Sequence, residues 1–252
     1  MPRTARIKSF TNTYHVMLRG INKQQIFFDD EDSRYFIKLL DRFKRPCGYQ
    51  LYAYCLMGNH IHLLIRNGEE VSIGEIFKHI GSAFVYWYNL KYERSGHLFQ
   101  DRYKSEPVND EAYLLTVLRY ILMNPVKAGI CYKADGYSYS SAREYLLGKP
   151  GITDTAFILR LISKRGLKEY LNRQNDDCCL EIDDSLRRGL TDDAAKKIIL
   201  REFQNLSPSV VSAKDRTALN TSICKLLRAG ISIRQLSRLT GISKKIIEKA
   251  KE

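Results

Sequence analysis

Two apolar runs joined by a glycine–asparagine pair constrain the fold of this chain more than any other feature. The runs are YQLYAYCLM, residues 49–57, and HIHLLIR, residues 60–66, and both are rich in residues that strands favour. The pair between them, Gly58-Asn59, suits a two-residue primed turn. The sequence therefore predicts a β-hairpin over residues 49–66.

Strand-like and helix-like segments surround this hairpin in a regular order. The run TYHVMLRG, residues 13–20, predicts a short strand closed by its glycine. Residues 29–45 predict a helix, because acidic residues gather in the first turn, apolar residues repeat at helical spacing and a proline follows. A second helical pattern covers residues 72–92, and GHLFQDRYKSEPV, residues 96–108, alternates as an extended strand would.

The resulting order is strand, helix, strand, strand, helix, strand. It fits an α+β fold in which two helices pack on one face of an antiparallel sheet, the ferredoxin-like arrangement. A further helix starts at Asn109 or Asp110, and we expect Pro125 and Gly129 to stop it.

Apolar periodicity weakens after about Gly148. We therefore expect a first domain over residues 1–148 and a helical connector over residues 149–204. An all-α domain with a helix-turn-helix would then cover residues 205–252.

Composition and charge narrow the class of protein. No stretch approaches the roughly 20 uncharged apolar residues that span a bilayer, and the first ten residues lack the apolar block of a secretory signal. The six cysteines show no paired zinc-finger spacing, so we expect reduced thiols. The net charge of +13 favours an anionic partner. We expect a cytoplasmic, nucleoid-associated protein with no membrane partner.

Two of the five histidines, His60 and His62, are separated by one isoleucine. Side chains at i and i+2 of a strand share a face, about 6.6 Å apart at Cα, so both imidazoles can converge on one ion. Ile61, Leu63 and Ile65 would then point into the core beneath the helices. Two imidazoles alone do not fix a metal ion, so two histidines on a partly solvated sheet face remain the alternative.

The predicted helix after residue 109 offers further groups. Tyr120 and Asn124 are four residues apart and so lie on one helical face, about one turn from each other. A phenol and an amide oxygen could thus approach the same ion, one as nucleophile and the other as ligand.

Four segments in this order resemble those of a known family. They are YHVMLRGINKQQIFFDDEDSRYF, YCLMGNHIHLLI, GHLFQDRYKSEPV and LRYILMNPVKAG, spread over roughly residues 7–145. In these segments the chain resembles the single-tyrosine HUH transposases, which are IS200-like, and most closely the REP-associated tyrosine transposases among them.

The resemblance implies a set of site residues and a reaction. The His-hydrophobic-His pattern falls on His60, Ile61 and His62, the nucleophilic tyrosine on Tyr120, and the polar residue that completes the metal site on Asn124. It implies Mg²⁺ or Mn²⁺ and the cleavage and joining of single-stranded DNA beside hairpins, through a 5′-phosphotyrosine intermediate. Tyr113, on the same helical face, is the runner-up nucleophile.

The same resemblance bears on the oligomeric state. In mobile relatives the tyrosine helix can complete a partner subunit's site, whereas the REP-associated group looks monomeric. We favour a monomer over a homodimer.

Other polar residues are candidates for DNA contacts. Gln100, Arg102 and Lys104 would share one face of the last strand, and Arg19 ends the first strand. An exposed polar strand face without a ligand is the alternative reading. The remaining histidines, His15, His79 and His97, are expected to be structural.

The C-terminal segment is strongly basic. Residues 201–252 hold 11 Lys and Arg against 4 Asp and Glu, a net charge of +7. Within it, SIRQLSRLTGISKKIIEKA predicts a helix-turn-helix with Gly241 in the turn and Ser243 as an N-cap. Its candidate contacts to duplex DNA or a hairpin stem are Arg234, Arg238, Lys244 and Lys245. A plain helical hairpin is the alternative.

These features predict a metal-dependent DNA endonuclease and strand transferase, a transposase with a tyrosine nucleophile. One alternative is a domesticated sequence-specific DNA-binding protein or regulator in which cleavage is not required. Another is a metal-dependent nuclease that uses water and leaves no covalent adduct on the protein.

Overall fold

A computed structural model describes residues 6–173, 179, 192–203, 216–229, 231 and 233–250. The chain divides into two compact units, Met1–Glu181 and Ile182–Glu252, and each is described by itself. Among the described residues, no helix is both long enough and apolar enough to cross a membrane.

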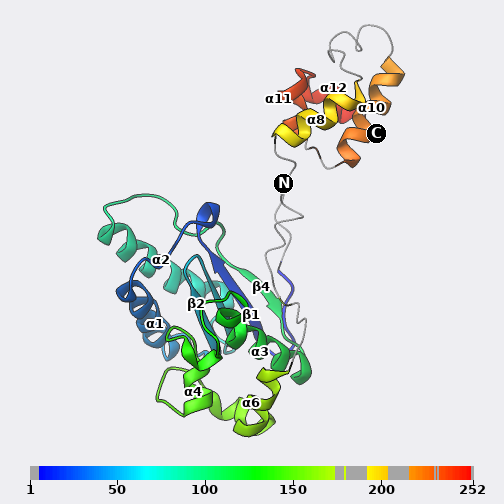
Figure 1. Ribbon diagram of the computed structural model, residues 1–252. Coiled ribbons are helices and arrows are strands. Elements are labelled where there is room, and N and C mark those ends of the chain that lie inside the picture. Colours follow the sequence, from blue (N-terminus) through cyan, green and yellow to red (C-terminus); the bar gives the residue numbers. More distant parts are fainter. Residues whose placement is uncertain are drawn as a thin grey trace. The chain divides into compact units, whose positions relative to one another are not determined.

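The first unit is built on a four-stranded antiparallel sheet (Figure 1). Its strands are β1 (Thr13–Arg19), β2 (Gln50–Met57), β3 (His60–Arg66) and β4 (Lys104–Pro107), in the spatial order β2-β3-β1-β4. Helix α1 (Asp30–Lys44) lies between β1 and β2 along the chain, and α2 (Ile73–Lys91) lies between β3 and β4. The predicted order of elements is confirmed.

Both crossover helices begin where the sequence indicated, because each has a capping box. Asp29 accepts a hydrogen bond from the Asp32 backbone N–H, and the Asp32 side chain accepts one from Asp29. Ser72 and Glu75 make the same reciprocal pair at the start of α2. Such pairs satisfy backbone donors that a helix start leaves without partners.

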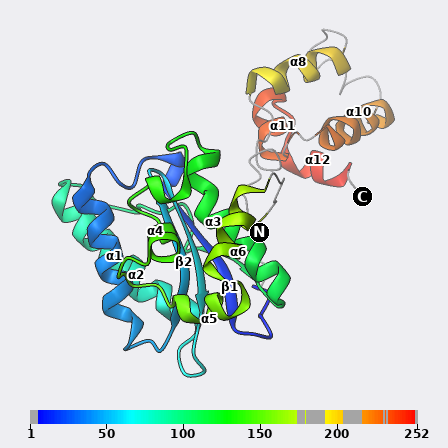
Figure 2. The same ribbon diagram turned by 60° about the horizontal axis from the view of Figure 1, so that its bottom comes forward.

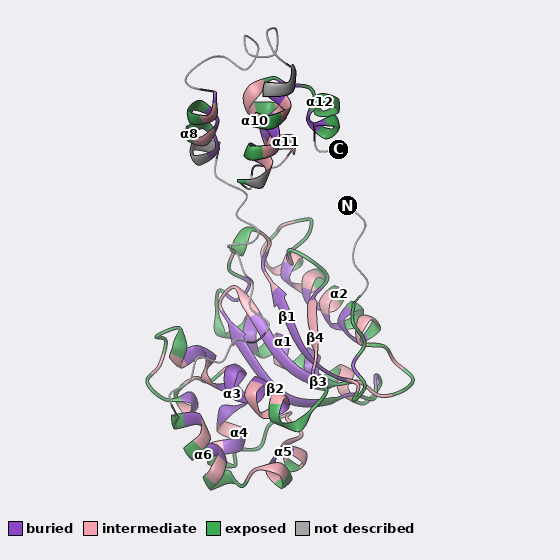
Figure 3. Ribbon diagram, turned by 90° about the vertical axis from the view of Figure 1, so that its right-hand side faces the viewer, coloured by how far each residue is buried: buried purple, intermediate pink, exposed green. Residues whose placement is uncertain are grey.

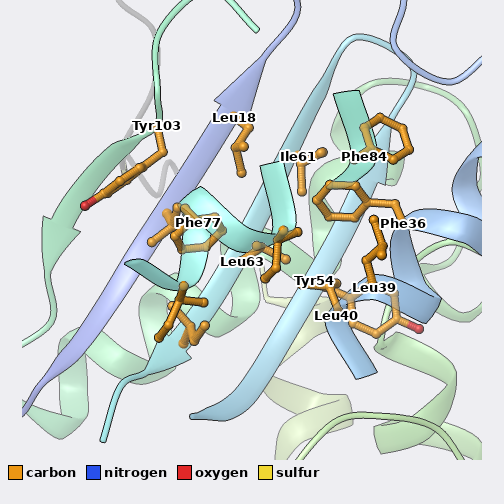
Figure 4. Packing of buried hydrophobic residues seen from close by; sticks show 14 of the residues in the cluster. Leu18, Phe36, Leu39, Leu40, Tyr54, Ile61, Leu63, Phe77, Phe84 and Tyr103 are labelled. Atoms are coloured by element: carbon orange, nitrogen blue, oxygen red, sulfur yellow. The ribbon is translucent and has the colours of Figure 1, made fainter. Parts of the chain in front are cut away.

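One face of the sheet packs against α1 and α2. Leu18, Ile61, Leu63, Phe36 and Phe84 belong to this core, and Figure 4 shows them between the sheet and the two helices. The prediction that the apolar residues of β3 point into the core beneath these helices is therefore confirmed.

The opposite face is covered as well, so the prediction of helices on one face only was wrong. Helix α3 (Glu111–Lys127) packs there against β2 and β3, with α6 (Lys164–Asn172) beside it (Figure 2). Ala53, Cys55 and Leu64 point to this side and are fully buried. A sheet that is apolar on both sides needs a layer on each.

Two local predictions were also wrong. The last strand begins only at Lys104, and residues 98–103 form an irregular segment in which Phe99 makes an isolated bridge to Gly20, the residue after β1. At the hairpin turn, neither Gly58 nor Asn59 has the positive φ of a primed turn. Tertiary contacts hold this turn instead, since both of its carbonyl oxygens accept hydrogen bonds from the loop after β1.

The first unit extends beyond the boundary expected at residue 148. Helices α4 (Ala142–Leu147), α5 (Thr155–Leu161) and α6 follow α3, and Ile158, Leu167 and Leu171 are buried in the core beneath α3. In Figure 3, helices α3, α4 and α6 show buried stretches beside exposed ones. Residues 149–173 are thus part of this unit and not a connector, because their buried apolar residues belong to the same core as those of α3.

The edge of β2 is closed by the same segment. Asp154 accepts a hydrogen bond from the Leu51 N–H at 2.8 Å and its own N–H donates to the Leu51 carbonyl oxygen at 2.7 Å. Ser141 makes a similar pair with Tyr54. An unpaired edge strand invites association with other chains, and these contacts remove most of that edge.

The second unit is helical where the structure describes it. It contains α8 (Asp192–Glu202), α10 (Arg216–Arg228), α11 (Ile233–Thr240) and α12 (Lys244–Lys249) around a core of its own. Ile199 and Phe203 belong to this core, so α8 packs with the C-terminal helices although it was expected in the connector.

Replacing Asp154 by alanine should lower the free energy of unfolding by about 1–3 kcal/mol, because the buried Leu51 N–H loses its acceptor. Asp154 also accepts from Lys44 Nζ at 2.9 Å. Urea denaturation measures the change. The matched control is Glu169→Ala, since Glu169 forms an exposed pair with Arg165, for which we expect less than about 0.5 kcal/mol. Equal losses in both variants would contradict this role of Asp154.

Candidate active site

The histidine pair lies on the sheet face beneath α3. Their ring centroids are 5.0 Å apart and the rings are nearly perpendicular. His62 is 2% exposed, whereas His60, at the start of β3, is partly exposed. The two rings are therefore neighbours on one face of the sheet, at the edge of the buried layer.

Helix α3 brings the two other predicted groups to this pair. The Tyr120 ring lies edge-on to His62, with the centroids 5.3 Å apart. Asn124, one turn later, hydrogen-bonds to His60 through its side chain. Both residues are at least nine-tenths buried. Lys127 adds a cation, with Nζ 5.2 Å from the centroid of the Tyr120 ring.

The end of α3 differs from the prediction at Pro125, which lies inside the helix and does not stop it. The Ala128 N–H donates to the Asn124 carbonyl oxygen and so carries the helix past the proline. Gly129, with φ +70°, then ends it. The Gly129 and Ile130 N–H groups bond to the Val126 and Pro125 carbonyl oxygens, which is a Schellman motif.

The imidazoles in this layer are neutral near pH 7. The pKa of His60 is lowered to about 4, chiefly by burial and then by the charge of Arg19, against the hydrogen bond to Asn124 that raises it. Burial holds the pKa of His62 well below 6.5, and the neighbouring His15 and His60 add to this effect. A neutral imidazole is the form that ligates a metal ion.

The structure reveals a third histidine that sequence reasoning treated as structural. His15 on β1 is fully buried, and its Nε2 is 3.0 Å from Nδ1 of His62. A signal existed in the alternation of β1, where Tyr14, Val16 and Leu18 enter the α1–α2 core. His15 must therefore face the other side, but the pairing of β1 with β3 was needed to place it beside His62.

The donor set fits a divalent cation. Nδ1 of His60 bonds to Asn59 Oδ1 at 2.6 Å and Nδ1 of His62 bonds to His15, so a cation would bind each ring through Nε2 and would replace the hydrogen bond between His60 and Asn124. The Asn124 amide oxygen supplies a third donor. The described residues contain no group of three His, Cys, Asp or Glu side chains that could hold a metal ion, so the candidate site depends on this amide. Such a set leaves positions for water or phosphate oxygens.

The predicted DNA contacts of the first unit do not all lie together. Arg19 pairs with His60 across β1 and β3, so it lies at the edge of the candidate site. Lys104 on β4 pairs with Met17, which in turn pairs with His62. Gln100 and Arg102 are exposed in the irregular segment before β4, so the prediction that they share a strand face with Lys104 was wrong. They line a groove of about 990 Å³ beside α2.

The runner-up nucleophile, Tyr113, has a different environment. It hydrogen-bonds to the Glu106 carboxylate on β4. Burial, and then this carboxylate, raise the pKa of its phenol above the usual range. Tyr120, not Tyr113, has its ring in contact with His62.

The predicted helix-turn-helix segment forms two helices, α11 and α12, separated by residues 241–243, with Gly241 at φ +74°. Ser243 lies at the N-cap of α12, as predicted, although its side chain makes no capping hydrogen bond. Lys244, Lys245 and Arg238 are exposed, whereas the side chain of Arg234 lies outside the described residues. The assignment of this pair as a DNA-binding motif stays a prediction.

Comparisons with known proteins agree with the fold of the first unit. Residues 8–124 match the model of the family described as "Transposase IS200 like". The chain is similar to the solved structure of a REP-associated tyrosine transposase bound to a REP hairpin, with a TM-score of 0.50 and 17% sequence identity, covering 62% of this chain and 96% of that one. A putative transposase from Deinococcus radiodurans R1 gives a TM-score of 0.35 with 19% identity, covering 48% of this chain and 95% of that one. No curated protein sequence matches the chain.

Gly129→Ala should lower the free energy of unfolding by about 1–2 kcal/mol, because alanine resists the positive φ that ends α3. A Cβ there would meet no atom within 4 Å, so the cost is conformational. Gly81→Ala, inside α2 and equally uncrowded, is the matched control and should raise stability by about 0.5–1 kcal/mol. Thermal or urea unfolding tests both, and a loss of the same size in each would show that the φ of Gly129 is not the cause.

Proposed function

Residues 8–124 belong to the IS200-like transposase family, and from this premise we propose that the chain cleaves and rejoins single-stranded DNA beside hairpin elements. Tyr120 is the proposed nucleophile, with a divalent metal ion, Mg²⁺ or Mn²⁺, held by His60, His62 and Asn124. The observation that carries the proposal is the edge-on contact of the Tyr120 ring with His62, 5.3 Å between centroids.

Each residue has a defined task in this reaction. His60 and His62 would bind the cation through Nε2, and Asn124 would bind it through its amide oxygen. When bound, the cation would polarise a non-bridging phosphate oxygen and offset the charge that develops on the phosphorus. Arg19, which pairs with His60 across β1 and β3, would contact the same phosphate.

The proposed bond changes balance without an external energy source. The Tyr120 oxygen attacks phosphorus in line and loses its proton, the bond to the 3′ oxygen breaks, and that oxygen leaves as a free 3′-hydroxyl. The 5′ phosphate stays on the tyrosine as a phosphodiester. A second 3′-hydroxyl can reverse the step and join a new strand. Lys127, over the Tyr120 ring, favours the phenolate through its charge.

A single chain suffices for this site. Tyr120 and the histidine pair come from the same chain and already lie in contact. This arrangement supports a monomer, since no second copy is required to bring the nucleophile to the metal ligands.

The hairpin preference rests on the relative with known structure, which was solved bound to a REP hairpin. For this chain we propose that Gln100, Arg102 and Lys104 contact backbone phosphates of the DNA. The helices α11 and α12 would bind duplex DNA or the hairpin stem as a helix-turn-helix, through Arg234, Arg238, Lys244 and Lys245. Their basic surroundings, +7 over residues 201–252, support this role.

Tyr120→Phe should abolish covalent adduct formation and lower strand cleavage by on the order of 10³-fold or more, since the nucleophilic oxygen is missing. The assay incubates the full chain with Mn²⁺ and a 3′-end-labelled single-stranded hairpin from DNA flanking its gene, followed by a denaturing gel. The label then follows the strand that stays on the protein. The control Tyr113→Phe should keep the slow-migrating adduct. DNA binding without any adduct in the unaltered chain would instead favour a regulator that does not cleave.

Asn124→Ala should weaken Mn²⁺ binding by at least about tenfold, the equivalent of about 1.4 kcal/mol, because one of three protein ligands is lost. Titration calorimetry on the metal-free chain measures this without DNA. Asn172→Ala, at an exposed position at the end of α6, is the control and should bind Mn²⁺ as the unaltered chain does. Unchanged affinity in Asn124→Ala would remove Asn124 from the site, and EDTA should prevent cleavage by every variant.

A further inference from the structure

A line of polar side chains leads from the partly exposed edge strand β4 to the candidate metal site. Glu106 on β4 pairs with His15 on β1, and Met17, two residues later, pairs with His62 on β3. Side chains two apart on a strand share a face, so all three polar groups lie on the side of the sheet that faces α3. None of the proposed catalytic steps uses His15 or Glu106.

The contact between the two imidazoles holds a single proton. His15 Nε2 and His62 Nδ1 are 3.0 Å apart, a hydrogen-bonding distance, and both rings are buried. One nitrogen therefore donates and the other accepts. Either His62 carries its proton on Nδ1 and donates to His15, or His15 carries its proton on Nε2 and donates to His62.

The far side of His15 decides between these arrangements. Its Nδ1 is 4.0 Å from Oε2 of Glu106, and neither atom has a hydrogen-bond partner among the described residues. If His15 donated from Nε2, its Nδ1 lone pair would face a carboxylate oxygen, which is repulsive. If His62 donates, His15 carries its proton on Nδ1 and directs it at Glu106, which is attractive.

Glu106 is itself held in place from α3. The Tyr113 phenol hydrogen-bonds to its carboxylate, so the acceptor is fixed by the same helix that carries Tyr120 and Asn124. This gives Tyr113 a function that does not involve attack on DNA.

We propose that Glu106 and His15 are positioning residues that hold His62 as the Nδ1–H tautomer and so present its Nε2 lone pair to the divalent cation. A ligating histidine whose other nitrogen is engaged keeps its ring orientation and its basicity, and loss of such a partner costs about 10- to 100-fold in metal affinity. The consequence for catalysis rests on the proposed metal site. The tautomer does not, because it exists in the metal-free protein.

The first test is nitrogen NMR of the metal-free full chain with ¹⁵N-labelled histidine. We expect His62 to show a protonated Nδ1 and an unprotonated Nε2. His15→Gln places an amide oxygen near the former Nε2 and should keep this pattern, whereas His15→Phe should shift His62 toward the Nε2–H form. His79→Gln, on α2 at the other face of the sheet, is the control and should change nothing at His62.

A second variant covers the case in which His15→Phe fails to fold. Glu106→Leu changes a side chain that is 35% exposed at the edge strand, and it should shift His62 in the same direction as His15→Phe. Mn²⁺ affinity should fall about 10- to 100-fold in Glu106→Leu and His15→Phe and recover in His15→Gln.

The outcomes separate this inference from the proposed function. Two results would overturn the proposed role of Glu106 and His15 even if the protein binds metal and cleaves DNA. One is an Nε2–H tautomer of His62 in the unaltered chain, and the other is unchanged His62 signals in both Glu106→Leu and His15→Phe. An Nδ1–H tautomer of His62 that is lost in Glu106→Leu and in His15→Phe would support the proposed role of these two residues. If this tautomer were found but neither the unaltered chain nor any variant bound Mn²⁺, the positioning role would be supported and the proposed metal site would be contradicted.

Discussion

The two-residue period of β3 is the constraint on which the rest of the first unit depends. Ile61, Leu63 and Ile65 enter the core under α1 and α2, which forces His60 and His62 to the opposite face. A shift of one residue in the pairing of β3 would put the histidines into the apolar core and the isoleucines beneath α3. The apolar packing that stabilises the fold therefore also fixes the site.

The proposed site on that second face depends on burial. Helix α3 and the helices after it exclude water from His15, His62 and Tyr120, and burial keeps the imidazoles neutral. Buried polar groups need partners, and here each histidine finds one through Nδ1 or Nε2: Asn59 for His60, and the His15–His62 contact for the other two. The same bonds occupy Nδ1 of His60 and of His62, so a cation would be ligated through their Nε2 atoms.

Sequence patterns sufficed for the elements whose signals are local. The hairpin over residues 49–66, the two capped crossover helices and the i to i+4 relation of Tyr120 and Asn124 follow from spacing alone, and the predicted resemblance to IS200-like transposases is confirmed. The positions of His15 and Glu106 could not be predicted, because they depend on β1 lying between β3 and β4. Alternation misled at residues 98–103, where Leu98 and Tyr103 are buried without a strand. Helices α5 and α6 are short, so their apolar residues gave too weak a period to show that they belong to the first core.

The central claim is that Tyr120 itself becomes linked to DNA, and peptide mass spectrometry tests it most directly. Trypsin cuts after Arg119 and Lys127 and releases YILMNPVK, residues 120–127, in which Tyr120 is the sole tyrosine. After reaction with Mn²⁺ and a single-stranded hairpin, and nuclease trimming of the DNA, this peptide should carry the mass of a nucleotide phosphate. The same mass on residues 105–119, which contain Tyr113, or cleaved DNA with no modified peptide, would contradict the account.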